Sequence, residues 1–294
     1  MLSRRFPRPL WLVCAALLVQ TGVAAAETSS CAETGHGPLS GDCVGDLYVR
    51  DGGVDLGGHT VFGRVVCLSD DCRVRSDPPD GRIVWIHREP AVGVEGAGRV
   101  SLTDVVVSGF SVGVRGADVD LAGALIVGNG GHGVWAEHTI ETVDSVVADN
   151  AQNGLHAALG TVTVLHSEVV GNRGHGVRAL TGVVAEDSTV ADNGGDGVRN
   201  FSALASIVRS KVTGNGLHGV RTDDSDCFPV GPFSLVDSVV SGNAIAAECA
   251  VSETCSDVVA CATPEMTGAN ACGTSSAMHS AGQRGSWSVC AADR

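Results

Sequence analysis

Residues 128–134 read Gly-Asn-Gly-Gly-His-Gly-Val, and the same kind of phrase returns along the middle of the chain. Each copy has a small residue or Asp, then Asn, three mostly small or polar residues, Gly and an aliphatic residue. The repeated asparagines are Asn129, Asn150, Asn172, Asn193 and Asn215, and Asn243 opens a sixth copy that does not finish. The first five are 21 or 22 residues apart. A period this regular indicates a solenoid in which each repeat is one coil.

Short runs inside each repeat favour strands. Residues 145–147 (Ser-Val-Val), 161–164 (Thr-Val-Thr-Val) and 188–190 (Ser-Thr-Val) are rich in β-branched residues. Gly, Asn and Asp separate these runs, and no helical period extends across a repeat. We therefore predict an all-β chain, a parallel β-helix whose coils of about 22 residues stack at the strand spacing of ~4.8 Å.

Two polar columns accompany the strands. A serine stands five residues before Asn in most repeats. These serines are Ser145, Ser167, Ser188, Ser210 and Ser238. Asn tolerates left-handed backbone, and its amide can bond to the coils above and below. We interpret both columns as structural ladders, because stacked polar side chains satisfy turn backbone groups that have no strand partner.

The residues that precede the repeats predict export. Residues 1–26 contain Arg4, Arg5 and Arg8, then an apolar run and three alanines, which is the pattern of a secretory signal peptide. No later stretch reaches the ~20 apolar residues that a membrane-spanning helix needs. We expect a secreted or periplasmic protein, or one held at the cell surface, without a membrane span.

Cysteines gather at the two ends of the repeats. An even number on each side favours disulfides in an oxidising compartment, and no Cys-x-x-Cys pair supports zinc. We expect an N-terminal cap and first coils over 27–73, repeats over 74–243 with an insertion near 222–232, and a Cys-rich cap or tail over 244–294. The cysteines are Cys31, Cys43, Cys67 and Cys72 before the repeats, and Cys227, Cys249, Cys255, Cys261, Cys272 and Cys290 at or after their end.

The charge of the chain limits its partners. Its 33 Asp and Glu outnumber its 19 Lys and Arg, for a formal net charge of −14. Loss of three basic residues with the signal peptide would make this 16 − 33 = −17. Such a charge argues against nucleic acid and anionic membrane surfaces. A polysaccharide or a cell-surface molecule is the expected partner, and the oligomeric state stays open.

One further phrase suggests a family. Residues 54–63 read Val-Asp-Leu-Gly-Gly-His-Thr-Val-Phe-Gly. Together with the Asn repeats, this phrase resembles the right-handed parallel β-helix (pectate-lyase-like) superfamily over residues 44–243, in particular its secreted members. Gly57 stands where the family usually has Asn. The resemblance implies a right-handed coil, but the superfamily includes lyases, hydrolases, epimerases and binding proteins, so it predicts no single reaction.

An outward-facing column is the candidate ligand-binding site. The second residue after each turn Gly points away from the core if the aliphatic residue between them points inward. This column contains Trp135, His156, Arg178, Arg199 and Arg221, preceded by Arg115. Stacked arginines repel one another unless an anionic ligand or neighbouring carboxylates offset the charge. The alternative is solvated surface arginine.

A second column lies just before each turn Gly. It contains His132, Asn153, His175, Asp196 and His218. Alternating His and acid can transfer protons, but the regular spacing favours turn hydrogen bonds. For glycoside hydrolysis, Glu168 with Asp187 or Asp144 is a possible carboxylate pair, although nothing in the sequence distinguishes them from surface charge. The catalytic residues stay unknown.

The catalytic phrases of the superfamily are incomplete here. The Asn-Thr-Asp and Arg-Ile-Lys phrases of polygalacturonases are absent, and residues 83–87 (Ile-Val-Trp-Ile-His) lack the Asp of the pectate-lyase phrase that they resemble. We predict no metal site and no cofactor; calcium is possible, but no clustered carboxylates support it.

These observations predict an exported, non-catalytic module that binds a glycan or a surface, or that has a structural role. The alternative is a polysaccharide-active enzyme, whether lyase, glycoside hydrolase or epimerase. A third class, accessory proteins that deliver copper, would need clusters of Met and His, whereas the chain has three Met.

Overall fold

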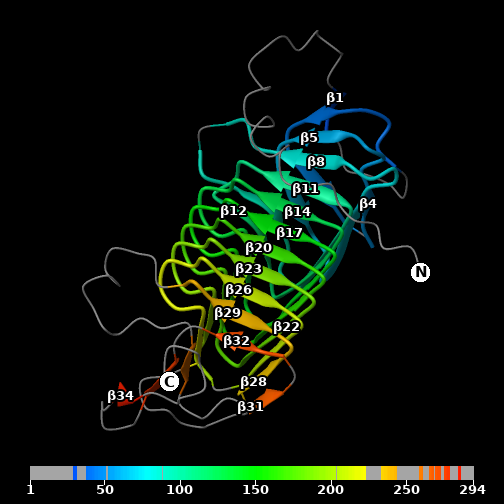
Figure 1. Cartoon of the computed structure of the whole chain (residues 1–294). Helices are drawn as coiled ribbons and strands as arrows, with labels where there is room; N and C mark the ends of the chain where they lie inside the picture. The colour runs from blue at the N-terminus through cyan, green and yellow to red at the C-terminus, as the bar shows by residue number, and fades with distance from the viewer. Residues whose placement is uncertain are drawn as a thin grey trace.

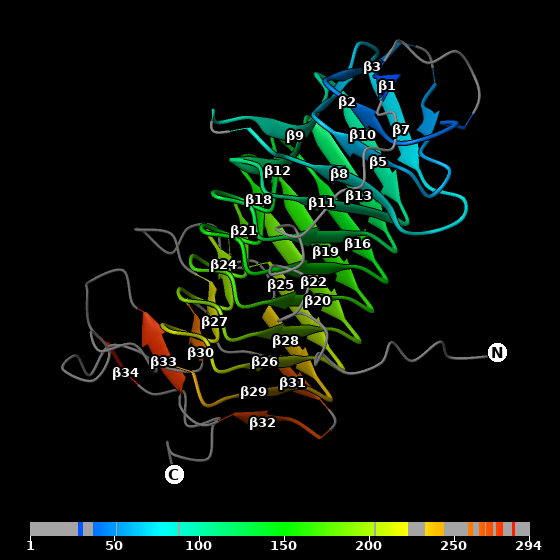
Figure 2. The same cartoon turned by 90° about the horizontal axis from the view of Figure 1, so that it is seen from above.

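The computed structural model is a parallel β-solenoid with three faces (Figures 1 and 2). It describes residues 29–31, 38–50, 52–87, 89–202, 204–222 and 233–243, and the segments 258–260, 265–267, 269–272, 275–278 and 284–285. Within these residues the chain forms no helix, so none that is long and apolar enough to cross a membrane. The predicted all-β solenoid is confirmed, and the handedness of its coil stays a prediction.

Three sheets form the faces. The first sheet contains β1 (Ser29–Ser30), β2 (Cys43–Val44), β5 (Thr60–Phe62), β8 (Gly81–Val84), β11 (Val105–Ser108), β14 (Leu125–Val127), β17 (Val146–Ala148), β20 (Glu168–Val170), β23 (Thr189–Ala191), β26 (Lys211–Thr213), β29 (Val239–Ser241) and β32 (Ala271–Cys272). The second sheet contains β4 (Val54–Asp55), β7 (Asp71–Arg75), β10 (Arg99–Thr103), β13 (Asp118–Ala122), β16 (Ile140–Val143), β19 (Thr161–Leu165), β22 (Gly182–Glu186), β25 (Ala205–Val208), β28 (Phe233–Val236) and β31 (Glu265–Thr267). The third sheet contains β3 (Leu47–Val49), β6 (Val65–Cys67), β9 (Val92–Glu95), β12 (Val112–Gly116), β15 (Val134–Ala136), β18 (Leu155–Ala157), β21 (Val177–Ala179), β24 (Val198–Asn200), β27 (Val220–Thr222), β30 (Val258–Ala260), β33 (Ser275–Met278) and β34 (Arg284–Gly285).

Each coil visits the first, third and second sheets in that order, as β14, β15 and β16 do. Ile126 pairs with Val147, which pairs with Val169 one coil further on. The sheets continue past residue 243 through β30, β31, β32 and β33. The region expected as a C-terminal cap therefore contributes further strands to the same solenoid.

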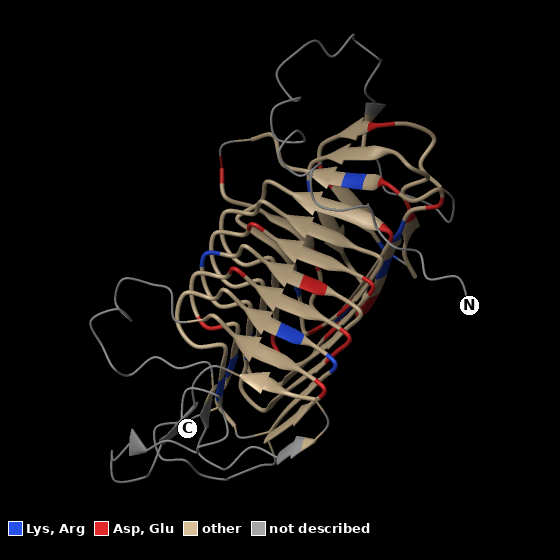
Figure 3. Ribbon diagram, in the orientation of Figure 1, with Lys and Arg blue, Asp and Glu red and all other residues tan. Residues whose placement is uncertain are grey.

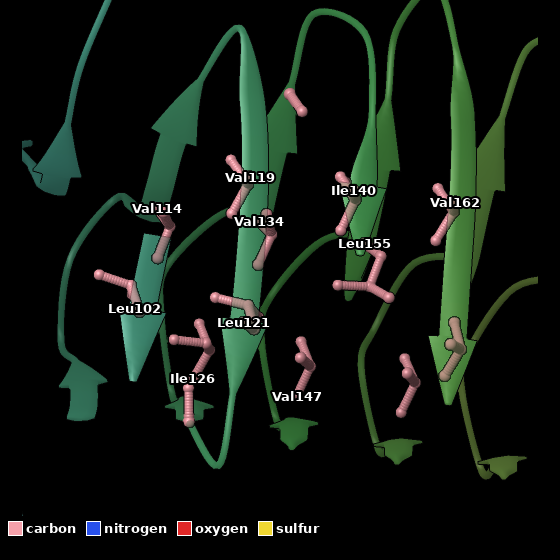
Figure 4. Close-up of a cluster of buried hydrophobic side chains, with 14 of the residues drawn as sticks. Leu102, Val114, Val119, Leu121, Ile126, Val134, Ile140, Val147, Leu155 and Val162 are labelled. Carbon is pink, nitrogen blue, oxygen red and sulfur yellow. The ribbon is translucent and has the colours of Figure 1, made fainter. Parts of the chain in front are cut away.

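The core is a stack of aliphatic side chains from all three sheets. Val134 and Leu155 point inward from the third sheet, Ile126 from the first, and Val119 and Ile140 from the second (Figure 4). Each is at most 1 % exposed. Because side chains alternate across a strand, the residues between these positions must face solvent. The β-branched repeats thus build the interior and leave one outward residue on the three-residue strands of the third sheet, such as β18 and β21.

The asparagine column lies at the turn between the first and third sheets. Asn172 Nδ2 donates to Asn193 Oδ1 at 2.9 Å and to the carbonyl of Val147 at 3.1 Å. Its Oδ1 accepts from Asn150 Nδ2 at 2.8 Å and from the Asn150 backbone N–H at 3.1 Å. The same chain of amide bonds runs from Asn129 to Asn243. The buried turn backbone is therefore satisfied by side chains.

The left-handed residue of this turn is the one before Asn, and not Asn itself. Gly128, Asp149, Gly171 and Asp192 have φ between 55° and 68°. Gly adopts this conformation without strain, and Asp adopts it more readily than most residues. This requirement explains why the repeat begins with either Gly or Asp.

The serine column occupies the turn between the second and first sheets. Ser167 Oγ donates to the carbonyl of Leu165 at 2.7 Å and accepts from the Ser145 backbone N–H at 3.0 Å. The residue before each serine has a left-handed backbone, as at Asp144 and Asp187. The hydroxyl thus satisfies two backbone groups at once.

Two disulfides lie in the described part of the region that precedes the repeats. Cys31 bonds to Cys43, and Cys67 bonds to Cys72. Cys272 is also disulfide-bonded. These bonds indicate an oxidising compartment. The expected signal peptide, the expected insertion around Cys227, and Cys249, Cys255, Cys261 and Cys290 lie outside the described residues.

Candidate functional site

The outer column forms a continuous row on the third sheet. The register pairs Trp135 with His156, His156 with Arg178, Arg178 with Arg199, and Arg199 with Arg221. The aliphatic neighbours of these residues are buried, so the row faces outward. Adjacent Cα atoms in such a stack are ~4.8 Å apart, and unit charges at that distance repel by roughly 0.9 kcal/mol in bulk water.

Four arginines line one open groove of about 570 Å³ on this face, which we call the arginine groove. Arg178, Arg199 and Arg221 come from the row, and Arg173 comes from the asparagine turn. Asp196 is the one acidic side chain among the described residues that line it. The groove is therefore cationic on an otherwise acidic chain, whose acidic residues recur at turns along the solenoid (Figure 3).

Four residues of the column before the turn Gly line the groove, namely His132, Asn153, His175 and Asp196. The His175 backbone N–H donates to Asn153 Oδ1 at 2.9 Å, the Asp196 N–H donates to His175 Nδ1 at 2.9 Å, and the His218 N–H donates to Asp196 Oδ1 at 3.0 Å. These side chains accept from turn backbone, so the column has a structural role. Because Nδ1 of His175 accepts, its neutral ring carries the proton on Nε2.

Arg178 contacts the neighbouring histidine directly. Its Nη1 lies 2.7 Å from His156 Nε2. Arginine only donates, so His156 must accept at Nε2 and carry its proton on Nδ1. His132 packs edge-on against His156, with ring centroids 4.9 Å apart. The lone pair of His156 that would act as a base is thus occupied by Arg178.

Phe201 supports two of the arginines. The guanidinium carbons of Arg178 and Arg199 lie 5.0 and 4.8 Å from its ring centroid. Such contacts stabilise a cation over an aromatic face. Arg199 Nη1 also lies 3.9 Å from Asp196 Oδ2, and the two side chains are 14 % and 2 % exposed. Arg199 therefore offsets the charge of a buried carboxylate.

The histidines of this face are held neutral. Burial and the charge of Arg178 lower the pKa of His156 to about 4. Burial lowers the pKa of His132, and Arg178 adds to that effect. Burial also lowers the pKa of His175, although Asp196 opposes the shift. At neutral pH the positive charge of the groove comes from arginine alone.

Trp135 lies at a second opening of about 360 Å³, which we call the Trp135 cavity. Glu95, Arg115 and Glu137 also line it. The Arg115 guanidinium lies 5.0 Å from the Trp135 ring centroid, and its Nη1 lies 3.6 Å from Glu95 Oε1. The column therefore divides along one face: Trp135 lines this cavity, and Arg178, Arg199 and Arg221 line the arginine groove. His156 lines neither, but a smaller hollow of about 100 Å³ beside Arg178 and Phe201.

The carboxylates considered for glycoside hydrolysis do not join either opening. Glu168 lies on β20 of the first sheet, and Asp144 and Asp187 lie at the turns that lead into that sheet. Asp187 instead accepts hydrogen bonds from Arg209 at 2.8 and 2.9 Å. These acids occupy a different face from the arginine groove.

Sequence reasoning missed the two residues outside the columns that contribute a charge or an aromatic ring to the groove. Arg173 follows a ladder asparagine, and Phe201 follows the end of β24. Neither recurs in neighbouring repeats, so a search for columns could not find them. The regular positions build the scaffold. The signal that could have identified Arg173 and Phe201 is that each differs from the residues at the same position of neighbouring repeats.

Neither a metal site nor similarity to a known protein indicates the function. The described part of the chain contains no cluster of three or more His, Cys, Asp or Glu arranged to hold a metal ion. No protein-family model matches the sequence, and no curated protein or solved structure shows significant similarity to it. The geometry of the third sheet is therefore the basis for assigning function.

Proposed function

We propose that this protein is an exported, non-catalytic module that binds an anionic glycan in the arginine groove. The observation that supports this most is the convergence of four arginines with one buried carboxylate, on a chain with a formal net charge of −14. Arginine presents planar pairs of donors that match carboxylate and sulfate oxygens. Such a ligand would offset the repulsion within the row.

Binding is favoured over catalysis because the catalytic phrases of the superfamily are incomplete in the sequence and three candidate bases beside the arginines already accept hydrogen bonds. His175 Nδ1 accepts from backbone and His156 Nε2 accepts from Arg178. Asp196 accepts from the His218 N–H and is 1 % exposed. A base must have a lone pair within reach of the proton that it abstracts. These groups instead hold the arginines and the turn in place.

Membership of the pectate-lyase-like superfamily is part of this proposal. A parallel solenoid with coils of 21 or 22 residues agrees with the resemblance of residues 54–63 and of the Asn repeats. A shared fold would not itself specify an activity. The proposal for the function therefore depends on the arginine groove.

Binding to a panel of charged and uncharged polysaccharides, with and without calcium, tests the proposal. We expect affinity for carboxylated or sulfated glycans that weakens with added salt, and no new reducing or unsaturated ends. Replacing Arg178, Arg199 and Arg221 by Gln should weaken binding at least about a hundredfold. Turnover of a glycan would contradict the non-catalytic assignment.

Two further variants keep this test interpretable. The double variant Arg178→Gln, Arg221→Gln keeps Arg199 beside the buried Asp196 and should fold. It therefore tests the groove even if the triple variant does not fold. Arg73→Gln, Arg82→Gln and Lys211→Gln together remove the same charge from the first and second sheets. If this control weakens binding as much as the groove variants do, then overall charge and not the groove recognises the ligand.

A further inference from the structure

The Trp135 cavity lies on the third sheet, like the arginine groove, but its side chains differ chemically from those of the groove. The charge of Arg115 is offset by Glu95, whose Oε1 lies 3.6 Å from Arg115 Nη1, and its guanidinium packs over the indole. Glu137 is exposed and adds a second carboxylate. The cavity thus presents an aromatic side chain and hydrogen-bond acceptors, and its excess negative charge repels anions.

The two openings lie along one line. Arg115 pairs with Trp135, Trp135 with His156, and His156 with Arg178 in the register of the third sheet. Trp135 and Arg178 are two coils apart, which is roughly 9.6 Å at the spacing of stacked strands. One extended ligand that follows the solenoid axis can therefore reach both openings.

We propose that the Trp135 cavity is a second subsite that takes an uncharged sugar ring of the same ligand. Carboxylates accept hydrogen bonds from sugar hydroxyls, and an indole packs against the apolar C–H face of a pyranose ring. The inference rests on the proposed function of the arginine groove. It narrows the ligand to a heteroglycan that contains both uncharged and acidic sugars.

A saccharide suits this face better than an extended peptide does. Strands from β9 to β27 of the third sheet pair with a neighbour on both sides. Their backbone groups are therefore not available for the strand addition by which extended peptides commonly bind sheets. Recognition must come from outward side chains, which here suit acidic groups, hydroxyls and sugar rings.

Two oligosaccharides distinguish the subsites. Trigalacturonate, in which every ring is acidic, should bind through the arginine groove alone. A hyaluronan hexasaccharide, in which acidic and uncharged rings alternate, should engage both openings. We expect Trp135→Ala to weaken the hexasaccharide about fivefold or more, as when ~1 kcal/mol of aromatic contact is lost. Affinity for trigalacturonate should change less than about twofold.

Control variants separate this inference from the proposed function. Trp135→Phe should retain most of the affinity, and Glu95→Gln with Glu137→Gln should weaken the hexasaccharide. Equal affinities of wild type and Trp135→Ala for the hexasaccharide would overturn the second subsite, as would tighter binding after the Glu replacements. If the Arg178→Gln, Arg221→Gln variant binds both oligosaccharides as tightly as wild type, the proposed function of the arginine groove is wrong instead. A polyglutamate peptide that binds more tightly than both saccharides, and depends on Trp135, would overturn the choice of a glycan.

Discussion

The asparagine turn and the arginine row both repeat one residue type on successive coils, with opposite consequences. An amide donates and accepts, so each Asn in the stack satisfies its neighbour and the column is buried. A guanidinium only donates and carries charge, so stacked arginines repel one another and cannot bond to one another; Arg178 bonds to His156, and Arg199 lies beside Asp196. Repetition of a self-complementary group stabilises a solenoid by itself, whereas a stacked cation needs partners of another residue type.

The largest expected effect is loss of a ladder asparagine. Asn172→Ala removes bonds to Asn150, Asn193 and the carbonyl of Val147, all buried. We expect the free energy of unfolding to fall by ~3 kcal/mol, because buried backbone groups lose their partners. Chemical unfolding followed by circular dichroism measures this. Gln152→Ala, at an exposed position of a neighbouring turn, is the control and should change stability by less than ~0.5 kcal/mol. Equal effects would show that the ladder is not a special source of stability.

Two glycines beside the ladder test the left-handed turn. Gly128 and Gly214 have similar φ angles, 66° and 68°. A Cβ added at Gly214 would lie 2.3 Å from Asp192 Oδ1, whereas a Cβ added at Gly128 would have no neighbouring atom within 4 Å. Gly128→Ala should lower the free energy of unfolding by ~1 kcal/mol through backbone strain alone, and Gly214→Ala by ~2 kcal/mol. Thermal or chemical unfolding of the pair gives the difference. An equal loss for both would mean that Asp192 moves aside freely.

The histidines beside the arginine row give a pH dependence. The folded-state pKa of His156 is about 4, below its ordinary 6.5. The unfolded chain therefore takes up this proton first, so stability is complete above pH 6.5 and falls as pH decreases toward 4. We expect the unfolding midpoint to fall between pH 7 and pH 4.5, and less so in His156→Asn. Carboxylates with lowered pKa, such as Asp118, lose most of their contribution below their ordinary pKa of 3.8, so most of this window reports the histidines. An unchanged slope in His156→Asn would assign the effect to other groups.

The smallest expected effect on stability comes from the arginine row itself. Arg178→Gln with Arg221→Gln should change the free energy of unfolding by less than ~0.5 kcal/mol, since lost contacts with Phe201 and His156 offset the relief of repulsion. Unfolding measurements at low salt check this. A large destabilisation would mean that the row holds the solenoid together, as the asparagines do, and would weaken the case for a ligand.

The sequence alone determined the solenoid, its period, and the asparagine, serine and outward columns. These features follow from repetition: where each coil has nearly the same length, like residues must stack, and alternation within a strand decides which side they face. The position of the left-handed residue before Asn was not determined, because Gly, Asp and Asn all tolerate that conformation.

Only the tertiary structure decided how the columns combine. It brought Arg173 from the turn and Phe201 from beyond β24 to the arginines, turned His175 toward the Asp196 backbone, and separated Trp135 into its own cavity. Turn geometry decides these contacts, and turn residues follow neither the period of a strand nor that of a helix. A site at the junction of strands and turns therefore depends on tertiary contacts. The repeat predicts the strand residues of such a site but not the turn residues that join them.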